Sequence, residues 1–296
     1  MAKYEGLING NILKGDLEFK RIIRKILTDG RKDINPRPHY SDGVPAHTIS
    51  YNHEISTYDL NAGELPLMTL RPIAVKSAIG EILWIYQDAS NDLNLFRDKY
   101  NAKWWDEWEV GDTRTIGEVY GKTVKNYDLM HRLLEGLEKD PDGRRHIMSL
   151  WQETDFTKPH GLKPCCFLTM WNVRHEIDGK DYLDMCMIQR SCDYVTAGSS
   201  INQLQYVVLQ YLVARHVKML PGKFTWFVDN IQIYDRHISA AKEMLERNPI
   251  SCKSSIWLNP DVDNFYDFTM NDIKILNYPI EEIKKINPNF KLDLGI

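Results

Sequence analysis

The first half of the chain combines helical hydrophobic spacing with polar loops. Residues 16–29 place Ile22, Ile23 and Ile26 on one helical face, and Gly30 follows as a stop signal. In the same half the pattern predicts a loop over 31–46, an edge or hairpin strand over 47–59, and helices over 73–87 and 127–139.

The second half contains mainly short apolar or alternating runs bounded by turn residues, which are typical of strands. These runs predict strands over 146–151, 165–174, 182–191, 223–234 and 254–259. A long apolar helix is expected over 201–219, ended by Pro221 and Gly222, and another helix over 235–247. Strands grouped in the middle and flanked by helices favour an α+β fold. No repeat or linker divides the chain, so we expect one domain over residues 1–296.

The composition excludes several classes of protein. With 43% hydrophobic and 26% charged residues among 296, the chain belongs to the soluble globular class and needs neither disulfide nor metal to fold. No apolar run approaches the roughly 20 residues of a membrane-spanning helix, and no signal peptide is visible. The 37 basic and 41 acidic residues leave no broad cationic surface, so we do not expect nucleic-acid binding.

The five cysteines all lie in the second half and include no CxxC pair, which argues against a zinc site or a dithiol redox site. Free thiols are typical of a reducing cytoplasm, where we expect the protein to reside. Cys165 follows Pro164 at the start of a strand, where a pocket can open. It becomes a nucleophile only if nearby cations lower its pKa; otherwise it is a buried, inert cysteine. Cys166 points to the opposite face of the strand, so the pair cannot readily chelate one metal.

Arginines provide candidate anion ligands. Arg144 and Arg145 follow a turn, and Arg190 precedes Ser191 at a strand end. Guanidinium groups near a hydroxyl suit a phosphate, although such arginines can equally form a solvated edge or ordinary ion pairs.

Three other features could carry chemistry. Glu81 lies in an otherwise apolar helix, so its carboxylate either reaches the surface or is buried with a raised pKa. Indoles at 104, 105 and 108 could be core or a wall for a flat heterocycle. Asn202 could cap the following helix or read the edge of a pyrimidine, and Tyr234 could supply a hydroxyl or pack in a strand.

Together these residues occur in an ordered set of short segments that resembles the bacterial-type, folate-dependent thymidylate synthase family. The resemblance runs from about Arg37 to Phe268. Its segments are 42–48, Glu81-Ile82-Leu83-Trp84, Trp105-Asp106-Glu107-Trp108, 116–121, 140–145, Pro164-Cys165, 189–193 and Tyr234-Asp235-Arg236-His237.

The resemblance implies a role for each candidate. The catalytic group would be Cys165 as nucleophile, Glu81 for proton transfer, Tyr120, Arg190 and Asp193. The dUMP ligands would be Arg37, Gln189, Arg190, Ser191, Asn202, Gln232 and Tyr234, with Arg144 and Arg145 donated by the other subunit of a homodimer whose interface is the sheet. The folate side would be Trp105, Trp108, Asp193, Gly198 and the C-terminal Ile296 of a closing tail.

The implied reaction is reductive methylation of dUMP to dTMP, with 5,10-methylenetetrahydrofolate as cosubstrate and no metal. Three features depart from the family pattern: Cys166 and Gln232 stand where histidines are usual, and the 194–201 stretch is one residue longer. Pyrimidine hydroxymethylases share the fold, nucleophile and folate donor but let water capture the methylene. They are the alternative function.

Overall fold

A six-stranded mixed sheet forms the centre of the fold. The computed structural model describes residues 12–293 and 295. The strand order is β1 (Arg31–Lys32), β2 (Thr48–Asp59), β6 (Leu220–Tyr234), β5 (Asp181–Asp193), β4 (Cys166–His175) and β3 (Ile147–Ser149). Neighbouring strands are antiparallel except β5 and β6, which are parallel. This mixed sheet with flanking helices confirms the predicted α+β class.

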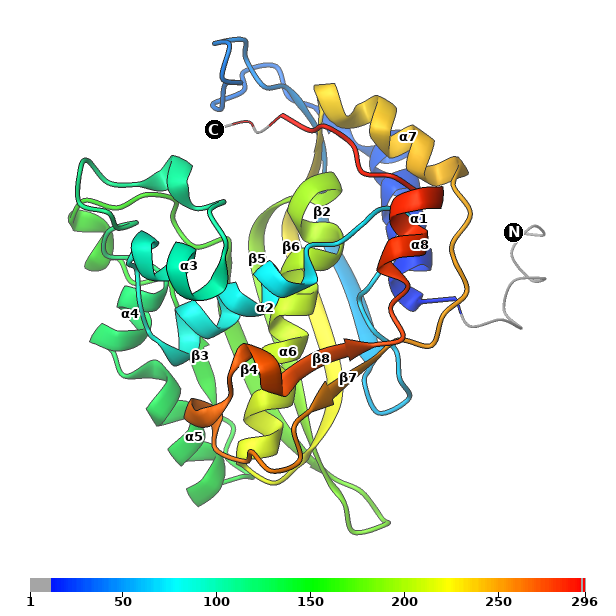
Figure 1. Cartoon of the computed structure of the whole chain (residues 1–296). Helices are drawn as coiled ribbons and strands as arrows, with labels where there is room; N and C mark the ends of the chain where they lie inside the picture. The colour runs from blue at the N-terminus through cyan, green and yellow to red at the C-terminus, as the bar shows by residue number, and fades with distance from the viewer. Residues whose placement is uncertain (1–11, 294, 296) are drawn as a thin grey trace.

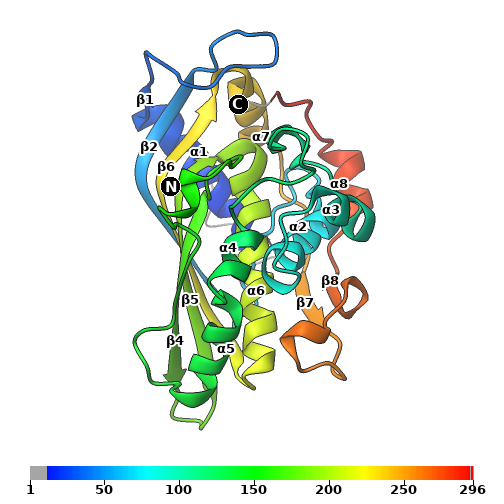
Figure 2. The same ribbon diagram turned by 90° about the vertical axis from the view of Figure 1, so that its left-hand side faces the viewer.

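Helices gather on one side of the sheet (Figures 1 and 2). They are α1 (Lys14–Asp29), α2 (Val75–Ile82), α3 (Leu93–Tyr100), α4 (Gly121–Asn126), α5 (Leu129–Lys139), α6 (Gln203–His216), α7 (Ile238–Glu246) and α8 (Ile280–Ile286). Most of α6 is buried, because its sequence is apolar on every side. A second, two-stranded sheet pairs β7 (Ser255–Leu258) with β8 (Ile273–Leu276).

The parallel pairing of β5 with β6 determines where polar side chains meet. Because the two strands run in the same direction, their carboxyl ends lie at the same edge of the sheet. The register pairs Ser191 with Asn230, and Asp193 with Gln232. Residues 39 positions apart in sequence are therefore brought together at one end of the fold.

The expected helix over 201–219 is the largest difference from the sequence prediction. A π-helical segment, Tyr194–Asn202, precedes α6 and is kinked where Ser199 and Ser200 have non-helical backbone. The helix α6 ends just before Lys218, which adopts a left-handed φ of 59°. Pro221 and Gly222 lie within β6 and are not a helix cap, so that expectation was wrong. The π-helical segment carries the stretch that the sequence analysis singled out for its extra residue.

Candidate active site

A cavity of about 1160 Å³ opens where β5 and β6 end. Most of the residues singled out in the sequence line it: Arg37, Glu81, Trp105, Trp108, Tyr120, Cys165, Gln189, Arg190, Ser191, Asp193, Asn202, Gln232 and Tyr234. The volume exceeds what one small ligand needs, because pockets for drug-sized molecules are typically about 300–1,000 Å³. The cavity can therefore hold two substrates together.

Cys165 lies beside a cation at the start of β4. Its Sγ is 3.5 Å from the Arg190 guanidinium, and its backbone N–H donates to the Tyr120 hydroxyl at 3.1 Å. Burial raises the pKa of the Cys165 thiol, and the charge of Arg190 opposes this effect. The free thiol is therefore protonated near neutral pH, with a cation in place to stabilise the thiolate when it forms.

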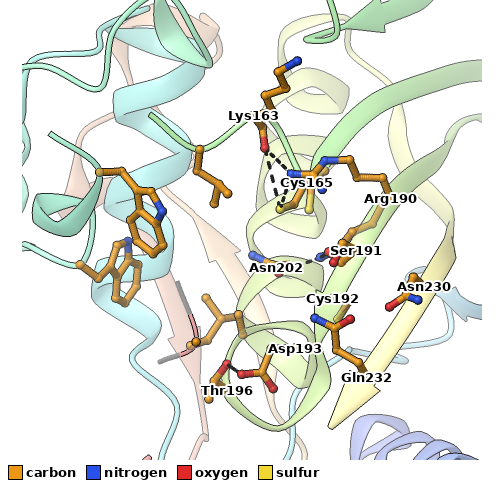
Figure 3. A pocket seen from close by; sticks show the side chains of 18 of the residues that line it. Lys163, Cys165, Arg190, Ser191, Cys192, Asp193, Thr196, Asn202, Asn230 and Gln232 are labelled. Atoms are coloured by element: carbon orange, nitrogen blue, oxygen red, sulfur yellow. Dashed lines mark hydrogen bonds between the residues drawn. The ribbon is translucent and has the colours of Figure 1, made fainter. Parts of the chain in front are cut away.

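Arg190 is held by backbone carbonyls and not by a carboxylate. Its guanidinium donates to the carbonyl oxygen of Pro164 at 2.9 Å. It also donates to the carbonyl oxygen of Lys163 at 2.7 Å (Figure 3). It also lies 5.8 Å from the centre of the Trp151 ring. Arg190 forms no ion pair with any residue in the described part of the chain, so its charge is available to an anionic ligand.

Tyr120 approaches the cavity from a strained backbone position. It precedes α4 with φ 52° and ψ −115°, outside the regions that side chains favour. Such a conformation costs on the order of 1–3 kcal/mol and is concentrated at functional sites. Burial raises the pKa of Tyr120 well above its usual range, so its hydroxyl stays protonated.

Glu81 is buried, which decides between the two interpretations of its place in an apolar helix. Only 8% of the residue is exposed, and the indole N–H of Trp104 donates to its Oε2. Burial raises the pKa of Glu81 to about 7, and the Trp104 hydrogen bond opposes the shift. This carboxyl can take up and release a proton near neutral pH. Trp104 belongs to the indole cluster recognised in the sequence, but its contact with Glu81 was not predicted.

The side-chain amide of Asn202 has one orientation. Trp226 Nε1 donates to Gln189 Oε1 at 2.9 Å, and Gln189 Nε2 donates to Asn202 Oδ1 at 3.1 Å. Asn202 Nδ2 in turn donates to Gln205 Oε1 at 3.1 Å. Because an indole nitrogen can only donate, it determines the polarity of the whole series. Asn202 makes no helix-cap hydrogen bond, so the capping alternative is wrong.

Asp193, at the end of β5, and Gly198, in the π-helical segment that follows, lie in different positions relative to the cavity. Asp193 accepts from the hydroxyl of Thr196 at 2.6 Å and the N–H of Val195 at 3.2 Å, and it faces the cavity (Figure 3). Gly198 is buried and does not line the cavity. A Cβ at Gly198 would lie 1.8 Å from Cys192 Sγ, so the glycine permits close packing behind the wall.

The C-terminal segment crosses the end of β6 and reaches the cavity. Gly295 lines the cavity, and its carbonyl accepts from the Tyr234 hydroxyl at 3.4 Å. The carbonyl of Asp293 lies 2.7 Å from His237 Nε2. Arg236 binds both Asp293 at 3.1 Å and Asp42 at 2.7 Å, which joins this segment to the 31–46 loop. Ile296 lies outside the described residues.

Comparison with known proteins agrees with this arrangement. A family model described as thymidylate synthase matches residues 17–289. The chain belongs to the thymidylate synthase family. It is 45% identical over 284 residues to the thymidylate synthases of Streptococcus pneumoniae (strain 70585) and Streptococcus gordonii, covering 96% of this chain and 99% of each relative. The solved structure of thermostable thymidylate synthase A from Bacillus subtilis superposes with a TM-score of 0.84 at 31% identity, covering 95% and 99% of the two chains.

Two arginines that the family resemblance assigns to the phosphate lie elsewhere. Arg144 and Arg145 are exposed in the turn before β3 and do not line the cavity of their own chain. The turn is tied to the β4–β5 hairpin by His175, whose Nε2 is 2.8 Å from Asp142 and whose Nδ1 is 2.6 Å from Asp181.

Two further observations on the described residues concern membrane-spanning helices and metal ions. None of the helices in this part of the chain is both long and apolar enough to cross a membrane. Within the same residues, no group of three or more His, Cys, Asp or Glu side chains could hold a metal ion.

Proposed function

We propose that residues 1–296 form one catalytic domain that converts dUMP to dTMP by reductive methylation, with 5,10-methylenetetrahydrofolate as the cosubstrate. One observation carries this proposal. The Cys165 thiol, the Arg190 guanidinium, the buried Glu81 carboxyl and the oriented Asn202 amide all line one cavity. A nucleophile, a cation, a proton carrier and a base-reading group are what the reaction requires.

Cys165 acts as the nucleophile. Its thiolate adds to C6 of the uracil ring, and the electron pair of the C5=C6 bond moves toward C5 and O4. Asn202 retains one N–H for O4 and one lone pair for the N3–H of uracil, while Gln189 and Gln205 hold its other atoms. Negative charge that develops on O4 therefore meets a fixed donor.

Glu81 manages the protons. After C5 has bonded to the one-carbon unit, C5 must lose its proton so that the folate can leave. A carboxyl with a pKa of about 7 can accept this proton, directly or through water, and release it again. The neutral Tyr120 hydroxyl, which already accepts from the Cys165 N–H, provides a second polar contact on that side of the ring.

The indole wall and the π-helical segment form the folate side. Bound folate supplies the one-carbon unit and then a hydride. Trp105 and Trp108 pack edge to face with ring centres 5.4 Å apart, and Asp193 offers its carboxylate from the opposite element. Water must be excluded during hydride transfer, because it would convert the methylene to a hydroxymethyl group. We assign that exclusion to Trp105 and to the C-terminal segment, with Ile296 at its end and Gly198 behind the wall.

The phosphate end requires a second subunit. Arg37, Arg190 and Ser191 line the cavity there and bind the phosphate, while Gln232 and Tyr234 contact the deoxyribose. We assign the remaining phosphate contacts to Arg144 and Arg145 of the other subunit. Exposure of this pair outside the cavity of its own chain supports the assignment.

The uncovered face of the sheet supplies a surface for a twofold homodimer. Ile55, Phe227, Ile188 and Leu168 pair across four strands, and none of them is buried. Ile55 is 55% exposed. A row of apolar side chains on one uncovered face is typical of an interface, and a twofold axis there makes each subunit complete the other's site.

Product analysis tests the reaction. The protein is incubated with dUMP and 5,10-methylenetetrahydrofolate, and both products are identified by mass spectrometry. Equal amounts of dTMP and dihydrofolate are expected. Hydroxymethyl-dUMP with tetrahydrofolate would overturn the proposal, because water would then have captured the methylene.

A mixing experiment tests the shared site. Cys165→Ser and the Arg144→Ala/Arg145→Ala double variant should each be nearly inactive. After unfolding and refolding together, half of the dimers are mixed and each carries one intact site, so about a quarter of the native specific activity should return. No recovery, with mixed dimers present by mass spectrometry, would show that these arginines serve their own chain.

A further inference from the structure

Three side-chain N–H groups, those of Trp104, Gln205 and Trp105, lie near enough to Glu81 to oppose the rise of its pKa. Among them, Trp104 Nε1 alone makes a direct hydrogen bond to Glu81 in the described part of the chain. Trp105 Nε1 and Gln205 Nε2 also line the cavity, and within those described residues they have no hydrogen-bond partner. These residues are 5% and 2% exposed, so both groups lie beside the carboxyl and are shielded from solvent. Oε2 of Glu81 therefore accepts a direct hydrogen bond, whereas Oε1 accepts none in the described part of the chain.

The two adjacent indoles have separate contacts. Trp105 packs against Tyr120 with ring centres 4.7 Å apart and forms part of the wall. Trp104 is half-buried, lies 6.4 Å from the Phe96 ring, and directs its N–H at Oε2 of Glu81. Phe96 is fully buried on α3 and so provides a fixed support for the indole.

We propose that Trp104 is a positioning residue for Glu81: its indole N–H occupies one carboxylate oxygen and leaves the other, Oε1, to exchange protons with the substrate. This inference rests on the proposed function of Glu81 as the proton carrier. It adds a cavity-lining residue that acts on the reaction through the carboxyl.

The hydrogen-bonding chemistry of the indole makes the two oxygens of Glu81 inequivalent. An indole nitrogen donates and cannot accept, so the oxygen that bonds Trp104 must accept, and an unprotonated carboxyl oxygen accepts better than a carboxylic acid hydroxyl. When Glu81 is protonated, its proton is therefore favoured on Oε1. Trp104 thus stabilises the ionised form, since a donor to a carboxylate favours the charged state, and it places the proton of the neutral form where the reaction can use it.

Removal of the N–H alone tests the proposal. Trp104→Phe keeps an aromatic ring against Phe96 but removes the donor. A hydrogen bond to a charged group is worth enough to shift a titration by about 1 to 2 pH units. We expect the Glu81-dependent midpoint of kcat/KM to move to higher pH by that amount, and kcat at pH 7 to fall about tenfold with KM for dUMP little changed.

Nuclear magnetic resonance gives a readout that does not depend on activity. In the native protein, the indole N–H resonance of Trp104, assigned by its absence in Trp104→Phe, should shift with pH near 7 as Glu81 titrates. In Glu81→Gln the resonance should no longer titrate. Trp257→Phe is the matched control, because Trp257 lies on β7 beside Lys274 and does not line the cavity; its pH profile should be unchanged.

The outcomes separate the two proposals. A Trp104 resonance that does not titrate, or a pH midpoint that is unchanged in Trp104→Phe, overturns the positioning role. If the resonance titrates but no dTMP forms from dUMP, the proposed function fails while the contact between Trp104 and Glu81 stands. If Trp104→Phe does not fold, the Trp104 resonance is assigned from its through-space contacts to the Phe96 ring, and its titration in the native protein and in Glu81→Gln still decides.

Discussion

The two ends of the cavity are built in different ways. At the end that would take the pyrimidine ring, Glu81 and Asn202 are held by side chains: the half-buried Trp104 for the first, and the buried Gln189 and Gln205 for the second. At the end that would take the phosphate, Arg37 is exposed, and Arg190 is bonded to two backbone carbonyls and to the Cys165 thiol, with no carboxylate partner in the described residues. Arg144 and Arg145 lie outside this cavity.

The difference follows from the charge of what each end binds. A neutral ring attracts its ligands only at contact distance, so its polar partners must already be oriented, and a mismatched buried group costs about 1–3 kcal/mol. A phosphate attracts arginines over several ångströms and can draw mobile side chains into place. Turnover should therefore depend on individual hydrogen-bonding atoms at the ring end, whereas binding of dUMP should depend on the number of positive charges at the phosphate end.

The largest effect is expected from Cys165→Ser at the ring end. A serine hydroxyl beside Arg190 is not activated as a nucleophile, so turnover should fall by at least about 10³-fold. The variant should still form dimers by analytical ultracentrifugation and bind dUMP by calorimetry. Near-normal turnover would remove Cys165 from its role.

The second largest effect is expected from Asn202→Asp, which tests whether individual hydrogen-bonding atoms matter at the ring end. In Asn202→Asp the carboxylate has no N–H for O4 of uracil, so kcat/KM for dUMP should fall about 100-fold. Binding of dCMP should improve relative to dUMP, because the amino group of cytosine can donate to the new carboxylate. Asn271→Asp, on an exposed turn, is the matched control. Equal discrimination in both variants would contradict the proposed base-reading role.

Arg190→Gln tests the phosphate end and its link to the thiol. Burial already raises the pKa of Cys165 and Arg190 opposes it, so loss of the guanidinium should raise this pKa further. Alkylation of Cys165 by iodoacetamide at pH 8 should slow about tenfold, and KM for dUMP should rise by a similar factor. The reaction of Cys165→Ser gives the background from the other thiols. Unchanged alkylation would show that the 3.5 Å contact has no electrostatic effect.

The smallest effect concerns the turn that carries Arg144 and Arg145. The carboxylates of Asp181 and Asp142 raise the pKa of His175 above its usual 6.5. The two ion pairs of protonated His175 therefore stabilise the fold fully below about pH 6.5. Their stabilisation is lost as pH rises through the pKa of His175 in the folded protein. His175→Asn should lower Tm by about 1 °C at pH 6 and leave it unchanged at pH 9. Calorimetry at both pH values measures the change in Tm. An equal fall in Tm at pH 6 and pH 9 would exclude protonation of His175 as the cause.

Periodicity predicted most of the sheet but not the segment before α6. β2, β4, β5 and β6 all coincide with alternating runs, since alternation reflects the two faces of a sheet directly. The π-helical Tyr194–Asn202 could not be predicted, because an apolar stretch fits several helical geometries equally well. The short α3, α4, α8 and β8 were missed because few buried residues mark them.

Site residues were predictable where a residue type stood in an unusual context, as Glu81 did in an apolar helix. Trp104 and Trp105 could not be assigned separate contacts, because the direction of neighbouring side chains in a turn depends on the backbone. Gln205 was missed although a signal existed. Three glutamines, at 203, 205 and 210, are nearly fully buried in an otherwise apolar α6, and a buried amide requires partners.

The close packing of Gly198 against Cys192 restricts which residues can replace either of them during evolution. No side chain fits at position 198 while a sulfur atom lies 1.8 Å from where its Cβ would be. Replacement of Cys192 by a smaller residue would remove that obstacle. Positions 192 and 198 should therefore covary among relatives, and a mutant library that varies only one of them would sample little beyond the present pair.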